Sequence, residues 1–235
     1  MAEIVDSPQL SPDDSDKTLP PKPAPLTSLS SSSKLDSAEV AHEAQIFVSI
    51  GASDLFRQAE ILSNLIQRRR SLKSLLPAAT PEIIEIMHPY AILISQDCDL
   101  ERDASARKDE IPDKIDTASD KILPNVLFCE VVTVEQLLAA VPKGKDIWKR
   151  IVQNKDERYH VLEKVPPSQD SQGTGLPALG IDFKRYFTVP TDELYVQVKT
   201  GTIRRCRLCT PYLEHFSNRL AHFLSRVALP RDHNI

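Results

Sequence analysis

The chain has 235 residues, of which 41% are hydrophobic and 26% charged, and its formal net charge is −4. This balance argues against a protein that coats nucleic acid indiscriminately, because such domains are clearly basic; a localised basic patch is compatible with it. No run of about 18 apolar residues is present, which argues against a membrane span. The first residues have neither a basic start nor an apolar core of signal-peptide length. We therefore expect a cytoplasmic protein whose four cysteines are reduced.

The N-terminal residues 1–37 differ in composition from the rest of the chain. They are rich in Pro, Ser and Asp, with PPKPAPLTSLSSSSK at their centre. Because they hold few large apolar residues, folding could not recover their conformational entropy. We expect a disordered tail over residues 1–37 and a single domain over residues 38–235, which is long enough to form one core without a disulfide or a metal.

Two structures fit residues 53–70, SDLFRQAEILSNLIQRRR. Apolar side chains recur there as on a helix face, and Ser53 could cap such a helix. The apolar positions are Leu55, Ala59, Leu62 and Leu65. A β-strand over AEILSNLI is the alternative, and the pattern does not decide between them. Arg68 opens a run of three arginines that could meet phosphates or lie in a solvated turn.

Short β-branched segments between Pro, Gly or polar residues predict strands. They are residues 83–86, 90–95, 126–133, 159–165 and 179–189. In the last of these, we expect Ile181, Phe183 and Phe187 to face the same side. EQLLAAV predicts a short helix and IWKRIV a helical turn, whereas the polar residues 101–121 predict a long surface loop.

The C-terminal segment has a helical pattern. Thr210 is a capping residue, and Pro211 suits the first helical position. One apolar stripe then follows at helical spacing: Phe216, Leu220, Phe223 and Val227. A neighbouring stripe is basic and consists of His215, Arg219, His222 and Arg226. It could bind phosphate or an acidic partner, or it could be the solvated flank of a packed helix. Short strands, one long loop and a closing helix together predict an α+β domain with a small, strongly bent sheet or barrel.

The stretch HPYAILISQDCDLERD, residues 88–103, changes from an apolar run to carboxylates on both sides of one thiol. If the chain stays extended through Asp99, this residue and Asp97 share one side with the acidic residues that follow. These carboxylates repel one another unless a hard cation or nearby arginines neutralise them. A solvated strand end is the alternative. We expect Gln96, Asp97 and Asp99 to anchor the following loop through backbone N–H groups.

The cysteines do not form a recognised site. Cys98 is expected to be a small buried residue, because the carboxylates beside it disfavour a thiolate and His88 lies about 33 Å away along an extended strand. Cys206 and Cys209 have zinc-knuckle spacing, and Cys98 and Cys129 would complete four thiolates. A second C-x-x-C is missing, so we predict neither a metal nor another cofactor. The chain has no phosphate-binding glycine loop, H-E-x-x-H or G-x-S-x-G, which argues against a nucleotide cofactor and the conventional enzyme classes.

The segment HPYAILISQD, residues 88–97, resembles the strand of PemK/MazF-like toxins that a basic residue and Pro enter and that ends near Ser-Gln. Ala59-Glu60-Ile61 is similar to the opening Gly-Asp-Ile of that family, and residues 126–133 are similar to its next core strand, which closes with Thr. The resemblance implies an SH3-like barrel with a C-terminal helix and metal-independent RNA cleavage. It places the catalytic basic residue and Thr of the family at His88 and Thr133. The Q-x-C-D-L strand end also resembles a group of bacterial proteins of unassigned function.

Three alternative functions follow from these patterns. The first is a cytosolic, non-catalytic binding module with a protein or RNA partner, because no convincing catalytic set is present. The alternative is the toxin-like endoribonuclease, in which His88 transfers protons, Thr133 orients the phosphate, and Arg68 or Arg219 neutralises it. A metal site around Cys98 and Asp99 is a second alternative. A concave pocket that unites His88, Thr133 and an arginine would favour the enzyme.

Overall fold

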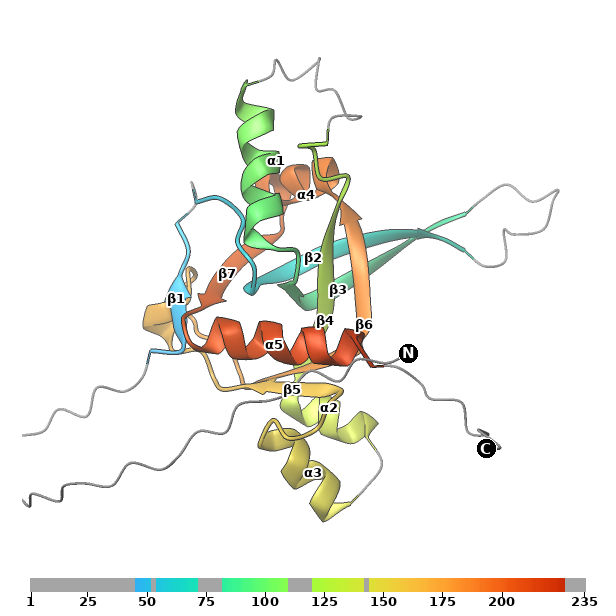
Figure 1. Cartoon of the computed structure of the whole chain (residues 1–235), viewed down its shortest axis with the longest axis vertical. Helices are drawn as coiled ribbons and strands as arrows, with labels where there is room; N and C mark the ends of the chain where they lie inside the picture. The colour runs from blue at the N-terminus through green and yellow to red at the C-terminus, as the bar shows by residue number, and fades with distance from the viewer. Residues whose placement is uncertain (1–44, 52–53, 72–81, 110–119, 142–143, 227–235) are drawn as a thin grey trace, which may run out of the picture. The chain divides into compact units, whose positions relative to one another are not determined.

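The computed structural model describes residues 45–51, 54–71, 82–109, 120–141 and 144–226. These residues form an α+β fold around one seven-stranded antiparallel sheet (Figure 1). The strands are β1 (Phe47–Ser49), β2 (Glu60–Arg70), β3 (Ile83–Leu93), β4 (Asn125–Thr133), β5 (Tyr159–Leu162), β6 (Leu179–Pro190) and β7 (Ile203–Leu208). The helices are α1 (Asp97–Asp109), α2 (Val134–Ala140), α3 (Lys145–Val152), α4 (Thr191–Thr200) and α5 (Tyr212–Leu224), with a 3₁₀ turn, η3, at Pro167–Gln169. The α+β prediction is confirmed. The predicted tail, residues 1–37, lies outside the described residues.

The strand order is β1-β7-β2-β3-β4-β6-β5, with β1 and β5 as the two edges. Hydrogen bonding among the described strands therefore does not close a barrel. Core residues from both edges, Phe47 of β1 and Leu162 of β5, nevertheless belong to the same buried cluster. None of the helices in this part of the chain is long and apolar enough to cross a membrane.

The segment at residues 60–70 is a strand and not the helix that its apolar spacing also allowed. Both Leu62 and Leu65 are buried on the same side of the sheet because Asn64, with φ of 60°, interrupts the alternation between them. A single strand, β3, replaces the two predicted over residues 83–86 and 90–95, and it pairs with β2 along its length. Ser53, the predicted helix cap, lies outside the described residues.

One face of the sheet is covered by α5 (Figure 1). Phe216, Leu220 and Phe223 are buried against the apolar side chains of this face, as their spacing predicts. The fourth member of the stripe, Val227, lies outside the described residues. Thr210 does not cap the helix: Pro211 occupies the N-cap position, and the Thr210 hydroxyl donates to Glu214 at 2.8 Å.

The opposite face of the sheet is covered by α1 and α4, which contribute Leu100 and Leu194 to a second buried cluster. Phe187 of β6 belongs to this second cluster, whereas Ile181 and Phe183 belong to the first. The expectation that these three side chains share a side is therefore wrong for Phe187. The reason is a bulge in β6 between Ile181 and Tyr186, which interrupts the alternation of the strand.

Helix α1 contradicts two predictions for residues 97–121. The strand ends at Leu93, so the chain is not extended through Asp99, and residues 97–109 are helical instead of forming a loop. Only a narrow side of α1 is buried, chiefly Leu100, Asp103 and Ala104. This side is too sparse in apolar residues to produce a helical pattern. Residues 110–119 lie outside the described residues.

Helix α4 and strand β7 were not predicted. In α4 the one buried apolar side chain is Leu194, so the helix has no apolar stripe. In β7, IRRCRL, arginines interrupt the apolar residues. Both elements are stabilised by contacts with distant residues. In α4, the Gln197 side chain forms hydrogen bonds with both backbone groups of Ile66, at 2.8 Å each. Strand β7 pairs with β1 and β2.

Candidate functional site

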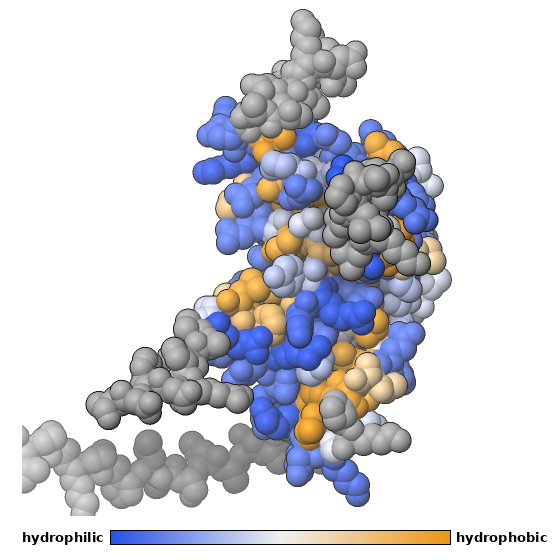
Figure 2. Space-filling model, turned by 90° about the vertical axis from the view of Figure 1, so that its right-hand side faces the viewer, coloured by the Kyte–Doolittle hydropathy of each residue, from blue (hydrophilic) through white to orange (hydrophobic). Residues whose placement is uncertain are grey.

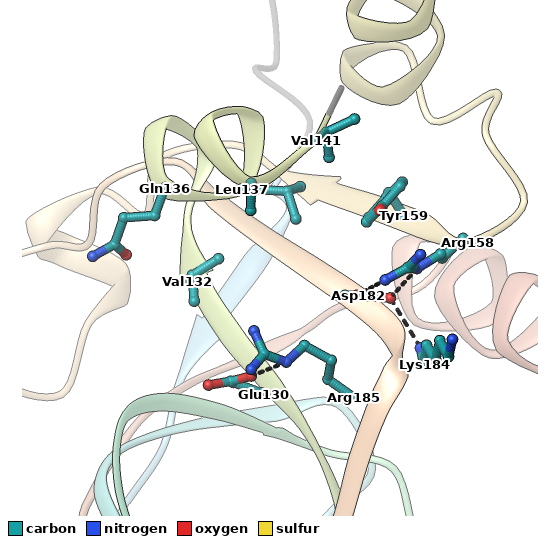
Figure 3. A pocket seen from close by; sticks show the side chains of 11 residues that line it. Glu130, Val132, Gln136, Leu137, Val141, Arg158, Tyr159, Asp182, Lys184 and Arg185 are labelled. Atoms are coloured by element: carbon teal, nitrogen blue, oxygen red, sulfur yellow. Dashed lines mark hydrogen bonds and ion pairs between the residues drawn. The ribbon is translucent and has the colours of Figure 1, made fainter. Parts of the chain in front are cut away.

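A cleft of about 660 Å³ lies between α2 and the β4–β6 part of the sheet (Figure 3). One wall is apolar and includes Val132, Leu137, Ala140 and Val141. The other wall is charged and includes Glu130, Arg158, Asp182, Lys184 and Arg185. The cleft can therefore contact an apolar group and an anionic group of the same ligand.

The apolar wall is placed by α2, which follows β4 directly. Thr133 accepts a hydrogen bond from the backbone N–H of Gln136 at 3.3 Å, and the Gln136 side chain accepts one from the backbone N–H of Thr133 at 3.0 Å. This capping box fixes where the helix starts. Gly180 lets α2 approach β6, because a Cβ at this position would lie 2.9 Å from the Cβ of Leu137.

The charged wall results from a bulge in β6. Cys129 of β4 pairs with Tyr186, and Val131 pairs with Ile181, so β4 advances by two residues while β6 advances by five. The extra residues interrupt the alternation of β6 and bring Lys184 and Arg185 to the cleft together. Bulges of this kind re-aim side chains and are common beside functional sites.

Two of the three cations of this wall are paired with carboxylates, and their own side chains are partly open to solvent. Arg185 contacts Glu130 at 2.7 Å, with 63% of the Arg185 side chain exposed. Arg158 makes a two-pronged contact with Asp182, at 2.7 and 2.6 Å, with 40% of its side chain exposed. Lys184 is exposed and has no carboxylate partner among the described residues. Because 63% of the Arg185 side chain is exposed, a ligand can reach this guanidinium. Arg158 is held more firmly, because only 9% of the Asp182 side chain is exposed and this carboxylate would be left uncompensated without its partner.

Tyr159 gives the cleft an aromatic surface next to a cation. The Arg158 guanidinium lies over the Tyr159 ring, 4.9 Å from its centroid. Partial burial raises the pKa of the Tyr159 hydroxyl, so the ring stays neutral at physiological pH. Figure 3 shows Tyr159 next to Arg158, with Leu137 on α2 and Val141 just after this helix.

Further apolar side chains are exposed on the part of the molecule that includes α2 and α3. Figure 2 shows hydrophobic residues in the lower part of the view, next to hydrophilic ones. In Figure 1, α2 and α3 lie at this height. The exposed apolar side chains of α3 are Ile147, Trp148 and Val152.

The predicted catalytic pair does not line the cleft. His88 lies behind it, 5% exposed, with its ring stacked on Phe187 at a centroid distance of 4.0 Å. The Thr133 hydroxyl is used in the capping box of α2. Burial lowers the pKa of His88, while the carboxylate of Glu130 raises it and Arg185 lowers it further. His88 is therefore linked to the cleft through Glu130, whose Oε1 lies 3.8 Å from its Nδ1, and through the charge of Arg185.

The predicted phosphate-binding residues lie elsewhere, and most have other contacts. Arg68 pairs with Glu85 and with Glu193 of α4, at 2.8 and 2.7 Å. Arg219 is half-buried and donates to the backbone carbonyls of Asp156 and Tyr159.

Of the rest of the basic stripe, His215 is exposed in the first turn of α5, with its ring 5.5 Å from that of His160, whereas His222 and Arg226 lie near the end of the helix or just after it. Arg226 stacks over the Phe223 ring at 3.9 Å from its centroid. His222 is exposed and borders a smaller pocket that Arg219 also lines. None of the four residues of the basic stripe borders the cleft.

Of the three predicted anchors, Asp97 contacts a residue that is distant in the sequence. It accepts a hydrogen bond from the backbone N–H of Gln58 at 2.6 Å, and so holds the chain before β2 instead of the chain that follows Asp97. Gln96 contributes its carbonyl to the first turn of α1, bonded by the Leu100 N–H at 3.2 Å. Asp99 is exposed, and among the described residues its carboxylate accepts one hydrogen bond, from the Cys98 thiol at 3.7 Å.

The anchoring carboxylate that the sequence did not reveal is Asp103. It is buried and accepts hydrogen bonds from the Leu123 backbone N–H at 2.9 Å and from Arg107 at 2.8 Å. The Tyr195 hydroxyl donates to it at 3.3 Å. Asp103 thereby ties α1 to the chain that enters β4.

The four cysteines do not converge. Cys98 is exposed on α1, so the expectation of a buried residue is wrong, whereas Cys129 and Cys206 are buried in the first core cluster. Burial raises the pKa of both buried thiols to about 12, which keeps them protonated. Within the described part of the chain, no three His, Cys, Asp or Glu side chains form a group that could hold a metal ion.

The charged wall of the cleft was missed by sequence reasoning, although the strand itself was predicted. The relevant signal is IDFKRYFTVP, in which Lys184, Arg185 and Tyr186 interrupt an apolar alternation. An interrupted two-residue alternation of this kind is what an extra residue in a strand produces.

Comparison with known proteins adds no assignment: the chain matches no protein-family model, and no curated protein or solved structure is significantly similar to it.

Proposed function

We propose that the protein is a non-catalytic RNA-binding module and that the cleft between α2 and β6 binds a nucleotide of a single strand. The observation that carries this proposal is the position of Lys184 and Arg185, which the β6 bulge brings to the cleft opposite an apolar wall. Proteins that bind single strands combine cations for the phosphates with aromatic or apolar surfaces for the bases.

The size and chemistry of the cleft support a nucleotide in particular. Its volume of about 660 Å³ falls within the range of about 300–1,000 Å³ that is typical of small-molecule sites. A phosphate can pair with Arg185 and Lys184, while a base can lie against Tyr159 and Leu137. The net charge of −4 favours contact at one local site over binding along the whole surface.

The positions of His88 and Thr133 support binding in preference to cleavage. His88 is buried outside the residues that line the cleft, and the Thr133 hydroxyl accepts a bond from the backbone of α2. Neither side chain is free to contact a ribose hydroxyl in the cleft. The toxin-like nuclease is the alternative that the experiment below separates from the binding module.

The SH3-like barrel remains part of the proposal. Its support is the single buried cluster that includes Phe47 and Leu162 from the two edge strands, as expected for a bent sheet wrapped around one core. A cytoplasmic location and an RNA partner belong to the same proposal.

The proposal is tested by fluorescence anisotropy with a labelled single-stranded RNA of mixed sequence. Lys184→Glu should weaken binding about tenfold, because one charge-assisted phosphate contact is replaced by repulsion. The matched control is Lys199→Glu on α4, which makes the same charge change at another exposed lysine and should alter binding less than about twofold. Lys184→Ala should also reduce the slope of log affinity against log salt by about 1.

Three outcomes would contradict the proposal. No RNA binding by the wild-type protein would exclude an RNA partner. Equal losses in the two lysine variants would show that the charge effect is not local to the cleft. RNA shortened on a denaturing gel in the presence of EDTA would replace the binding module with the metal-independent nuclease.

A further inference from the structure

We propose that His88 is a positioning residue of the cleft. When an anion binds Arg185, Glu130 loses its arginine partner and pairs instead with a protonated His88, so that binding is accompanied by the uptake of one proton. This inference rests on the proposed RNA-binding function and adds to it a coupled protonation step.

The imidazole of His88 is held rigidly behind the cleft. Its ring lies 10° from parallel with the Phe187 ring, and its Nε2 lies 3.3 Å from Oε1 of Gln67. With this oxygen as acceptor, the neutral ring carries its proton on Nε2, and Nδ1 is left with a lone pair.

The Nδ1 atom is buried and has no hydrogen-bond partner among the described residues. The nearest carboxylate oxygen is Oε1 of Glu130, at 3.8 Å, which is too far for a hydrogen bond. A lone pair that faces a carboxylate is unfavourable, whereas a proton on Nδ1 would turn the contact into a charge-assisted hydrogen bond after a small movement of Glu130.

In the free protein, Arg185 opposes that protonation. It holds the other oxygen of Glu130, Oε2, at 2.7 Å. The polar or charged groups that face His88 from the packed strands are Gln67 of β2, Glu130 of β4 and Arg185 of β6. Burial is the main cause that lowers the pKa of His88, and the positive charge of Arg185 lowers it further.

A phosphate in the cleft changes the effects of both Arg185 and Glu130 on the pKa of His88. It pairs with the Arg185 guanidinium, which cancels the repulsion between Arg185 and a protonated His88. It also leaves Glu130 without its partner and able to accept from Nδ1. Both effects raise the pKa of His88 in the complex, so the complex binds more protons than the free protein.

The sign of the pH dependence follows from this linkage. Because the pKa is higher in the complex, RNA affinity rises as the pH falls through the pKa of the complex. It becomes constant below the pKa of the free protein. Above both values the coupling contributes nothing.

The test uses the full chain and a 5′-labelled decauridylate, whose phosphodiesters and uracil rings do not titrate near neutral pH. Affinity is measured from about pH 5 to about pH 8, the range in which histidines titrate. Isothermal titration calorimetry in two buffers with different ionisation enthalpies gives the number of protons taken up. We expect uptake that approaches one proton per complex for the wild-type protein.

Glu130→Gln is the decisive variant, since it keeps the shape of the side chain but cannot form the carboxylate–imidazolium pair. It should still bind the decauridylate, with a pH dependence and a proton uptake clearly smaller than in the wild-type protein, because the phosphate then affects His88 only through Arg185. The matched control is His222→Gln on α5, which removes an exposed histidine away from the cleft and should keep the wild-type profile.

Each alternative outcome has a distinct meaning. Wild-type binding that does not vary with pH would overturn the role of His88 and leave the RNA-binding proposal standing. A Glu130→Gln variant that keeps the wild-type pH dependence would also overturn it. No binding of the decauridylate at any pH would overturn both proposals.

Discussion

At the scale of single residues, the exposure of each arginine separates structural ion pairs from those of the cleft. Arg204 pairs with Glu60 and Arg205 with Asp170, and in both pairs the arginine side chain is about one-tenth exposed. Removing one partner of such a pair leaves a buried charge uncompensated. Arg185 is 63% exposed and its partner Glu130 is 23% exposed, so this carboxylate can be exchanged for a ligand at a smaller cost. Exposure therefore decides which arginine is available for binding.

Asp170 provides the clearest pH dependence of stability. Its carboxylate accepts two bonds from Arg205, at 2.8 and 2.7 Å, and further bonds from the backbone of the loop that follows, among them the N–H of Gly175 at 2.9 Å. These contacts, those of Arg205 first, hold the pKa of Asp170 well below its usual range. The stabilisation is present above the unfolded-state pKa of about 3.9 and is lost as the pH falls towards the folded-state value.

We predict that Asp170→Asn lowers the free energy of unfolding at neutral pH by about 3 kcal/mol, because Arg205 loses its buried partner. The acid sensitivity below about pH 4 should become shallower than in the wild-type protein. Urea denaturation at several pH values measures both effects. Asp99→Asn is the control, since this carboxylate is exposed, and it should change stability by less than about 0.5 kcal/mol. An Asp170→Asn variant as stable as the wild type would contradict the account.

At the scale of elements, local pattern predicted those that bury an apolar stripe and missed those held by polar contacts. The stripe of α5 was recognisable because Phe216, Leu220 and Phe223 recur at helical spacing. Helix α1 was not, because its inner side carries Asp103, whose partners include Leu123 and Tyr195, far along the chain. Such partners cannot be read from a local window of sequence.

The cleft also combines features that the local sequence predicts with features that depend on distant residues. Strands β4 and β6 and helix α2 were all predicted near their observed bounds, so the parts of the site were visible in the sequence. Their combination was not, because it depends on the cross-strand register at Val131 and Ile181 and on the close approach at Gly180. Register and helix–strand distance are tertiary properties.

The start of α2 provides a test at this scale. Thr133→Ala removes the side-chain half of the capping box and should lower the free energy of unfolding by about 1 kcal/mol. Thr133→Ser keeps the hydroxyl and should stay close to the wild type. Chemical denaturation of the three proteins gives the comparison. A Thr133→Ala protein with wild-type stability would show that this cap does not contribute to the helix.

At the scale of the whole described molecule, the sheet has α5 on one face and α1 and α4 on the other, and α2 extends β4 at the side of the cleft (Figure 1). The cleft therefore lies outside both main core clusters. Changes to the exposed Lys184 or Arg185 should alter binding while leaving folding intact. The candidate basic surfaces, at the cleft, at Arg68 and along α5, lie on different elements, so their contributions can be measured separately.

The most direct test of the central claim is to locate bound RNA on the protein. The full chain is irradiated with a single-stranded RNA that carries 4-thiouridine, and the cross-linked peptides are identified by mass spectrometry. The account predicts cross-links at Tyr159 or within residues 182–186, and their loss in Lys184→Glu but not in Lys199→Glu. Cross-links confined to the peptide of Arg68, or to the peptide that contains Arg219 and His222, would place the RNA elsewhere and contradict it.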